Sequence, residues 1–425
     1  MTFNPARVHD VAVGTLALTA FCLPLYVVRW HLGPLPTTLL ENVVGLNVLA
    51  YIGVLWYERR PPRFGTPYDI PIGLLLVAGI IGIVVAPDHA RAIGIYRAYF
   101  VEAIAVFYIA ADVLHTKRDL RTVVIGLVGS GVWMSLGEIA TFTYAELHHS
   151  LQIGAAPAFL NTSANAVALY LEPPLAFAAG AVLFGENRRL RLIAAACLGV
   201  IVLADLLTLS RGGYGSLAVL GAIVVASLPT WRARFITTAA VLASAVLFFS
   251  VPLIRARLAT VQFSILLRDS LYQQAFHVLA QRPIFGAGIS GYPVRAAPFR
   301  PPTQTIELYP HNLWLTTWSE IGLLGVVAFG VIFFGVLWRG FRAIPKTEGL
   351  FKAVTWGAVG ALVLYLVHGM VDSPYWKNDL AIEFWFVAAF AVVAVRSGGA
   401  SAQPTRPEVG QVGAANDSLL RSRLH

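Results

Sequence analysis

The sequence predicts an all-α polytopic membrane protein with about twelve transmembrane helices. Hydrophobic residues occupy 57% of the 425 positions and charged residues only 12%, about half the charged share of a soluble domain. Apolar stretches of near-spanning length recur along the whole chain. They lie at residues 11–29, 36–56, 70–86, 96–114, 121–142, 163–184, 190–209, 213–229, 235–253, 311–338, 351–371 and 379–395. No small-residue cleavage site follows the first stretch, so we expect a retained helix there.

Basic residues mark alternate connections between these stretches. The clusters are Arg59, Arg60 and Arg63; Lys117, Arg118 and Arg121; Arg188, Arg189 and Arg191; Arg232 and Arg234; and Arg339, Arg342, Lys346 and Lys352. The positive-inside rule assigns all five connections to the cytoplasm, together with both termini. Residues 143–162 contain no Lys or Arg, which fits the opposite side. We therefore attribute the net charge of +9 to membrane topology rather than to nucleic-acid binding.

One connection is much longer than the others, and it divides the chain into four parts. Residues 1–253 contain nine predicted helices, 254–310 form a large outer loop, 311–396 contain three more helices, and 397–425 form a disordered cytoplasmic tail. Apolar residues at helical spacing predict amphipathic helices along the bilayer over residues 255–281. The Gly-rich run from Arg282 to Tyr292 predicts a turn.

Eleven basic residues break the topology rule because they fall on the predicted outer side. They are Arg29, Arg91, Arg97, Arg211, Lys377, and Arg255, Arg257, Arg268, Arg282, Arg295 and Arg300 of the large loop. Guanidinium groups bind phosphate bidentately and keep their charge when desolvated, so this surface favours an anionic ligand. The alternative for any single arginine is that it snorkels to lipid headgroups or caps a helix.

Arg211 is the strongest of these candidates. It follows one apolar run and precedes another with no hydrophilic loop between them, and two glycines follow it. Ionisable residues at such depth are costly and usually functional. Asp205 lies six residues earlier but on a different helical face, so a simple pair with Arg211 is not expected. Asp205 remains open as a buried structural acid.

His311 is the candidate general base, because it begins a long apolar span at the predicted outer side, where its charge is easily tuned. The alternative is a structural histidine at the membrane edge. Glu320, on the same span, is either a partner of the site or a helix-packing residue. Asp372 ends the next span on the same side and either orients a histidine or an arginine or caps a turn.

Several chemistries lack their sequence motifs. The chain has no Asp-x-Asp, no His-Glu-x-x-His, no Gly-Lys-Ser/Thr and no Gly-x-Ser-x-Gly, and its two cysteines, Cys22 and Cys197, lie in separate apolar runs. These absences argue against metal-dependent sugar transfer, an esterase of the nucleophile-elbow type and a disulfide framework. The run Gly286-Ala-Gly288-Ile-Ser-Gly291 matches G-x-G-x-x-G but lacks the strand of a dinucleotide site.

Four motifs between about residue 160 and 375 resemble the O-antigen ligase and polymerase superfamily of bacterial envelope glycan enzymes. They are Asn161-Thr-Ser-Ala-Asn165; Ser210-Arg211-Gly212; Arg268 followed by Arg282-Pro283-Ile-Phe285-Gly286-Ala-Gly288; and His311-Asn312, nine residues, then Gly322 and Gly325. The last pattern is similar to the signature of the ligase branch and is the most specific. No internal repeat is visible, which disfavours the runner-up of another class, a twelve-helix lipid or glycan transporter.

The resemblance implies a GT-C-like glycosyltransferase in the bacterial inner membrane, with its active site facing the periplasm. It implies transfer of O-antigen from an undecaprenyl pyrophosphate donor to the lipid A-core acceptor, with inversion and with no metal or other cofactor. It assigns catalysis to His311, Arg211 and Arg268, and substrate binding to Arg255, Arg257, Arg282, Asn312 and Asp372. A polymerase of the same superfamily is the nearest alternative.

Overall fold

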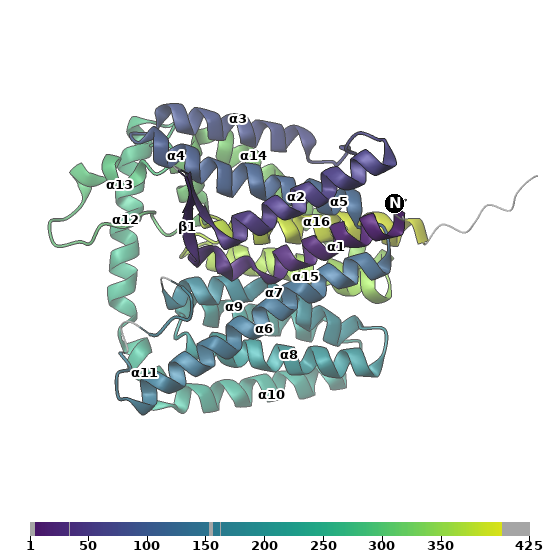
Figure 1. The fold of residues 1–425 in the computed structure, drawn as a ribbon. Coiled ribbons are helices and arrows are strands. Elements are labelled where there is room, and N and C mark those ends of the chain that lie inside the picture. Colours follow the sequence, from purple (N-terminus) through teal and green to yellow (C-terminus); the bar gives the residue numbers. More distant parts are fainter. Residues whose placement is uncertain (1–4, 34, 153–155, 162, 402–425) are drawn as a thin grey trace, which may run out of the picture.

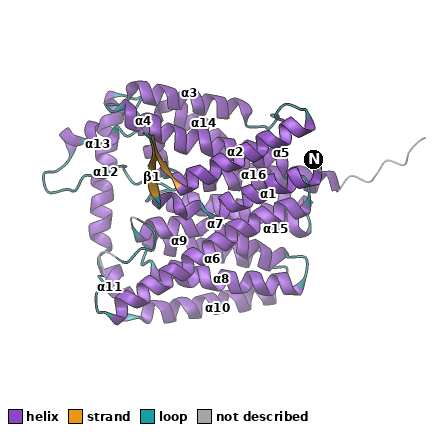
Figure 2. Ribbon diagram, in the orientation of Figure 1, coloured by secondary structure: helices purple, strands orange, loops and turns teal. Residues whose placement is uncertain are grey.

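The computed structural model describes residues 5–33, 35–152, 156–161 and 163–401. Within these residues the chain is a bundle of α-helices with one small hairpin (Figures 1 and 2). The helices are α1 Pro5–Phe21, α2 Leu39–Glu58, α3 Asp69–Val85, α4 His89–Tyr96, α5 Ala103–Val113, α6 Lys117–Leu147, α7 Ala164–Phe184, α8 Arg188–Leu207, α9 Arg211–Ser227, α10 Trp231–Ser250, α11 Pro252–Ala259, α12 Val261–Gln281, α13 Tyr292–Arg295, α14 Leu313–Ala343, α15 Gly349–His368 and α16 Asn378–Ser401. The hairpin pairs β1 Arg29–Leu32 with β2 Leu35–Thr38, antiparallel.

Each predicted span overlaps a helix of the bundle. Nine helices in the described residues are long and apolar enough to cross a membrane, with α4 and α5 counted as the single helix His89–Val113. The expected number of about twelve includes α1, α3 and α9 as well, which have 17 residues each, at the lower limit for a spanning helix. The first predicted span is also shorter than expected, because the chain leaves the helix after Phe21, before Pro24, and enters a 3-10 turn.

The centre of the bundle is formed by α7, α15 and α16, whose side chains are largely buried, whereas α10 has no buried residue. Two glycines bring α7 and α15 close together. A Cβ on Gly180 would lie 2.4 Å from the Ala353 carbonyl oxygen, and one on Gly357 would lie 2.6 Å from the Phe177 ring. Small residues at such contacts allow helix backbones to approach closely in a membrane.

The two ends of the bundle differ. At one end, which we call the α12 end, α12 crosses the ends of the other helices with α11, α13 and the hairpin nearby (Figure 1). At the opposite end, residues of two basic clusters lie against the end of α7: Lys117 and Arg121 are 3.6 and 2.5 Å from Glu186, and Lys352 lies over the ring of Phe184. These contacts place three of the five basic connections, those around residues 117–121, 188–191 and 339–352, at the same end of the bundle.

Where helices were expected, over residues 255–281, the long connection contains α11 and α12, and an irregular turn follows them. At the other predicted boundary, α16 continues to Ser401, beyond the expected start of the tail at residue 397. The rest of that predicted tail, residues 402–425, lies outside the described residues.

Candidate active site

His311 lies between two carboxylates just before α14 begins. Its Nδ1 is 3.0 Å from Asp372 Oδ1, and its Nε2 is 3.3 Å from Glu307 Oε2. A third of the His311 side chain is exposed, whereas the Asp372 side chain is only 12% exposed. Because each ring nitrogen faces an acceptor, the arrangement fits an imidazolium that donates from both nitrogens.

The two carboxylates favour the charged form of this histidine. Burial opposes the charge, but the charge and hydrogen bond of Asp372, followed by those of Glu307, outweigh burial and raise the pKa of His311 to about 10. The hydrogen bond from His311 is the largest cause that lowers the pKa of Glu307. Burial acts against ionised Asp372, but His311 outweighs it and holds the pKa of that carboxyl well below its usual range. At neutral pH the cluster is one cation between two anions.

The backbone at His311 is held in an unusual conformation. Its φ is +52°, a region in which a non-glycine residue costs about 1–3 kcal/mol. Asn312, the N-cap of α14, accepts from two backbone N–H groups of the first turn and donates to the Met370 carbonyl at 3.1 Å. The Leu313 N–H donates to the Gly369 carbonyl at 2.7 Å. The Asn312 amide thus joins α14 to the turn after α15, and its predicted part in substrate binding stays a prediction.

Three arginines gather around the start of α12. Arg211, the first residue of α9, donates to the Thr260 and Ser264 hydroxyls and, at 2.7 Å, to the Arg257 carbonyl. Arg257 in turn donates from Nε, at 3.1 Å, to a backbone carbonyl two residues before Arg211. Nη1 of Arg268 is 3.5 Å from the Ser264 carbonyl. Arg211 and Arg268 therefore meet at one residue of α12.

Arg268 also connects the arginines to the histidine cluster. Its Nε donates at 2.8 Å to the carbonyl of Val371, the residue before Asp372. In the described part of the chain, neither Arg211, Arg257 nor Arg268 forms an ion pair with a carboxylate. Three guanidinium groups without counter-ions are suited to an anion such as pyrophosphate.

A buried pair supports the turn that carries Arg211. Nδ1 of His368 is 2.7 Å from Glu172 Oε1, and each side chain is only 1% exposed. A Cβ on Gly212 would lie 2.2 Å from Nε2 of His368, so glycine is required for the start of α9 to pack against this ring. The same histidine belongs to the turn that ends at Asp372, whose N–H donates to the His368 carbonyl at 2.9 Å. His368 therefore contacts the turn that carries Arg211 through its ring and the turn that ends at Asp372 through its backbone.

Asp205 lies on α8 and packs against the next glycine, with 2.9 Å between its Oδ1 and a Cβ built on Gly213. Asp205 and Arg211 form no ion pair within the described residues, which agrees with the helical-face argument. Both carboxylate oxygens of Asp205 are buried and lack a hydrogen-bond partner among the described residues. Asp205 is thus a buried acid beside the start of α9.

The Gly-rich turn after α12 is built into a break in α14. In an unbroken helix the Leu323 N–H would donate to the Ser319 carbonyl. Here Leu323 donates to the Ile284 carbonyl at 2.9 Å, and the Ser319 carbonyl accepts from the Ala287 N–H at 2.6 Å. The exchange satisfies both groups inside the protein, as irregular backbone at membrane depth requires. Gly322, with φ +70° and ψ −174°, makes the break.

Close backbone contact explains the glycines of two of the motifs. A Cβ on Gly322 would lie 2.3 Å from the Ile284 carbonyl oxygen, and one on Gly286 would lie 2.4 Å from the Ser319 carbonyl oxygen. Glu320, whose role the sequence left open, accepts the backbone N–H of Ser290 and so holds this turn. The spacing from His311 to Gly322 therefore sets how far along α14 the histidine lies from the Gly-rich turn that packs at Gly322.

No hydrogen bond among the described residues joins the remaining predicted substrate-binding arginines to this cluster. Arg255 is exposed and donates to the Ser250 carbonyl at 3.1 Å. Arg282 is exposed just after the far end of α12, fourteen residues from Arg268, which is about 21 Å along a helix. The structure thus joins Arg211, Arg257, Arg268, His311 and Asp372 by contacts that include neither Arg255 nor Arg282.

Sequence reasoning missed two carboxylates. Glu307 precedes His311 by four residues, a spacing that is informative only in a helix, and this segment is irregular. Glu172 had a clearer signal, because it is the only charged residue in its predicted span. Its partner His368 is distant in sequence, so the pair itself was not visible.

Fold and site together define a multi-pass α-helical membrane protein with a cationic, histidine-containing site at one end of its bundle. Residues 175–330 match the model of the O-antigen ligase family, Wzy_C. The chain therefore carries the O-antigen ligase domain of this enzyme family, whose substrates are lipid-linked glycans. The matched residues include Arg211, Arg268 and His311, and the resemblance seen in the sequence is confirmed. No curated protein matches the sequence.

Proposed function

We propose that the protein transfers O-antigen polysaccharide from undecaprenyl pyrophosphate to the lipid A-core oligosaccharide, without a metal and with inversion at the anomeric carbon. The observation that supports this most is the continuity of the site. Arg211 and Arg268 share Ser264, and Arg268 contacts the residue before Asp372, which contacts His311. An anion-binding group thus adjoins a proton-accepting group at one end of the bundle.

The arginines act on the leaving group. The acceptor hydroxyl oxygen bonds to the anomeric carbon while the bond from that carbon to the pyrophosphate oxygen breaks, and its electron pair stays on the carrier pyrophosphate. Arg268 and Arg211 stabilise the negative charge that grows there, an effect often worth about 3–4 kcal/mol for one well-placed donor. Arg257 adds positive charge to the same surface. A single displacement of this kind inverts the anomeric centre.

The resting His311 is an imidazolium, so Nε2 must first release its own proton to solvent as Glu307 leaves that nitrogen. Nε2 of the neutral ring then accepts the hydroxyl proton. Asp372 on Nδ1 then orients the ring and stabilises the imidazolium that forms, the role that a buried carboxylate has in other histidine-containing sites. The acceptor hydroxyl takes the position of the Glu307 carboxylate, which is 3.3 Å from Nε2 in this structure. Asn312 holds the backbone that carries His311.

The topology that accompanies this function has about twelve crossings, with α1, α3 and α9 included. The basic end of the bundle faces the cytoplasm together with both termini, in accord with the positive-inside rule. The α12 end faces the periplasm from the inner membrane. Both substrates are lipids, so they reach the site laterally through the bilayer.

The test uses the full-length protein reconstituted with the lipid-linked donor and lipid A-core in the presence of EDTA. The wild type should attach glycan to the acceptor, and the His311→Ala and Arg211→Ala variants should lose at least a hundredfold in rate. Arg300→Ala, which changes an arginine of the same loop outside the site, is the control. Size-exclusion profiles and thermal stability confirm that each variant folds.

Full activity in both site variants would contradict the assigned roles. Chain growth from single carrier-linked repeats without an acceptor would instead identify a polymerase. Uptake or release of glycan across the membrane without a new glycosidic bond would identify a transporter.

A further inference from the structure

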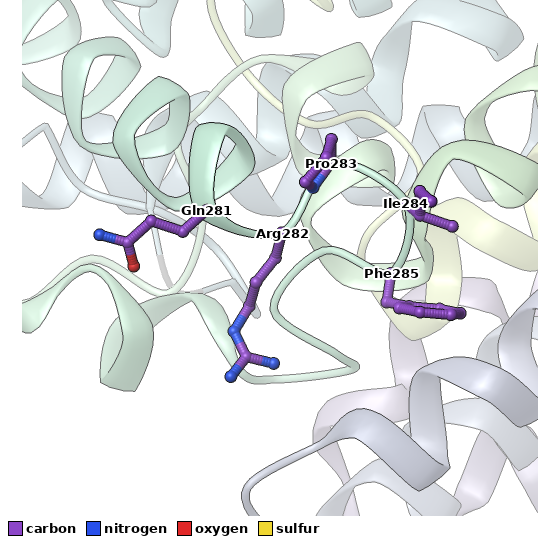
Figure 3. A pocket seen from close by; sticks show the side chains of 5 residues that line it. All are labelled: Gln281, Arg282, Pro283, Ile284 and Phe285. Carbon is purple, nitrogen blue, oxygen red and sulfur yellow. The ribbon is translucent and has the colours of Figure 1, made fainter.

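A second cationic position lies at the far end of α12. Residues 281–285 line an open depression of about 440 Å³, and Figure 3 shows the Arg282 side chain extending from this turn, with Ile284 and Phe285 further along the same segment. The catalytic arrangement proposed above does not use Arg282, because about 21 Å of helix separates it from Arg268. A single pyrophosphate cannot contact both arginines.

A second arginine of the same loop, Arg295, also has an unused donor. Nη2 of Arg295 is 3.4 Å from the Val85 carbonyl, and its Nε is buried without a hydrogen-bond partner among the described residues. Burial, and then the positive charge of Arg282, lower the pKa of Arg295, so the two charges disfavour each other. Neither arginine has an ion-pair partner in the described part of the chain. An anion would relieve both the repulsion and the unpaired donor.

An apolar surface adjoins these charges. Ile284 and Phe285 are 60% and 52% exposed. The Ile284 carbonyl accepts from Leu323 of α14, and Leu323, Val327 and Val331 continue from there as an exposed apolar row at i, i+4 and i+8. A cationic position above an apolar row on a membrane-spanning helix matches a phosphorylated lipid headgroup above its acyl chains.

We propose that Arg282 and Arg295 bind a phosphate on the sugar headgroup of the acceptor glycolipid, whose acyl chains lie along the Leu323–Val331 row. This proposal rests on the proposed function. Two lipid substrates with anionic headgroups must be held at the same time, and two anion positions at opposite ends of α12 keep their lipid tails apart. The donor pyrophosphate occupies the Arg268 position, and the sugars of the acceptor extend from the Arg282 position towards His311.

The test measures binding of lipid A-core to the full-length protein in nanodiscs, with the acceptor either phosphorylated or dephosphorylated. Arg282→Gln should weaken binding of the phosphorylated acceptor about tenfold or more, the effect of losing one charge-assisted contact, and should leave binding of the dephosphorylated acceptor and of the donor unchanged. Arg300→Gln, in the same loop, is the matched control. Equal affinity of wild type and Arg282→Gln for the phosphorylated acceptor would overturn the proposal.

Two further measurements distinguish the acceptor phosphate from other lipid phosphates, and this inference from the proposed transfer reaction. If phosphatidylglycerol competes as well as the phosphorylated acceptor does, the position binds general lipid headgroups and the acceptor assignment is wrong. Binding needs no turnover, so a wild type that transfers no glycan refutes the proposed function without deciding this inference. In a working transfer assay, Arg282→Gln should raise the KM for the acceptor while kcat and the KM for the donor stay unchanged.

Discussion

Replacing Glu307 with Gln should shift the pH dependence of transfer to lower pH and accelerate the reaction at neutral pH. Glu307 lies 3.3 Å from Nε2 of His311, and with Asp372 it raises the pKa of His311 to about 10. Only the neutral ring accepts a proton. At pH 7 a group of that pKa is neutral in about one molecule in a thousand.

The magnitude follows from the charge that is removed. An opposite charge at this distance shifts a pKa by about 1–3 units, and because 29% of the Glu307 side chain is exposed, solvent screening favours the lower value. A fall of about one unit raises the neutral fraction of His311 tenfold at pH 7. The sign is fixed, because loss of a carboxylate lowers the pKa of the imidazolium and so moves the acidic limb of the profile to lower pH.

The assay is the pH profile of kcat/KM for the acceptor, which reports ionisations of the free enzyme. Glu146→Gln, an exposed carboxylate outside the site, is the control and should leave the profile in place. Asp372→Asn should lower the rate at every pH, because Asp372 also orients the ring. Loss of activity in Glu307→Gln would show that Glu307 itself takes the proton, and an unmoved profile would show that His311 does not.

Two glycine substitutions test the packing that holds the site. Gly212→Ala should lower transfer at least tenfold in a folded protein, because its Cβ would lie 2.2 Å from the His368 ring and displace the start of α9. The control is Gly215→Ala, whose Cβ would have its nearest neighbour at 4.0 Å and which should leave the rate unchanged. Equal transfer rates in the two variants would show that Gly212 does not position the site. Gly322→Ala should destabilise the protein by about 1–3 kcal/mol in thermal unfolding, because the φ of Gly322 is +70° and a Cβ would lie 2.3 Å from a backbone oxygen. The control is Gly330→Ala, whose Cβ would have its nearest neighbour at 3.8 Å and which should not destabilise the protein. A Gly322→Ala variant of unchanged stability would show that the break in α14 is dispensable.

The positions of the helices were predictable because a membrane imposes a minimum apolar length, and that length is a local property of the sequence. The site was predictable to the extent that its residues violate a local rule. Arg211 and Arg268 carry positive charge on the predicted outer side, where the positive-inside rule expects none, and both belong to the observed cluster. Arg282 violates the same rule equally, yet lies elsewhere, because the rule assigns a side of the membrane and not a position on it.

The parts that could not be predicted depend on contacts between distant segments. The break at Gly322 exists because the Ile284 carbonyl takes the place of a helical acceptor, and a glycine in an apolar helix does not by itself indicate this. The pairing of Glu172 with His368 likewise joins α7 to α15. The charged state of His311 depends on Glu307, which an irregular segment brings to the ring, so the sequence predicted a base but not its resting protonation.

The most direct test of the central claim is a structure of the full-length protein with bound undecaprenyl pyrophosphate. Phosphate oxygens should lie about 3 Å from the guanidinium nitrogens of Arg268, on the side that faces His311, with Arg282 free of the carrier. A pyrophosphate bound at Arg282 with Arg268 unoccupied would contradict the proposed active site.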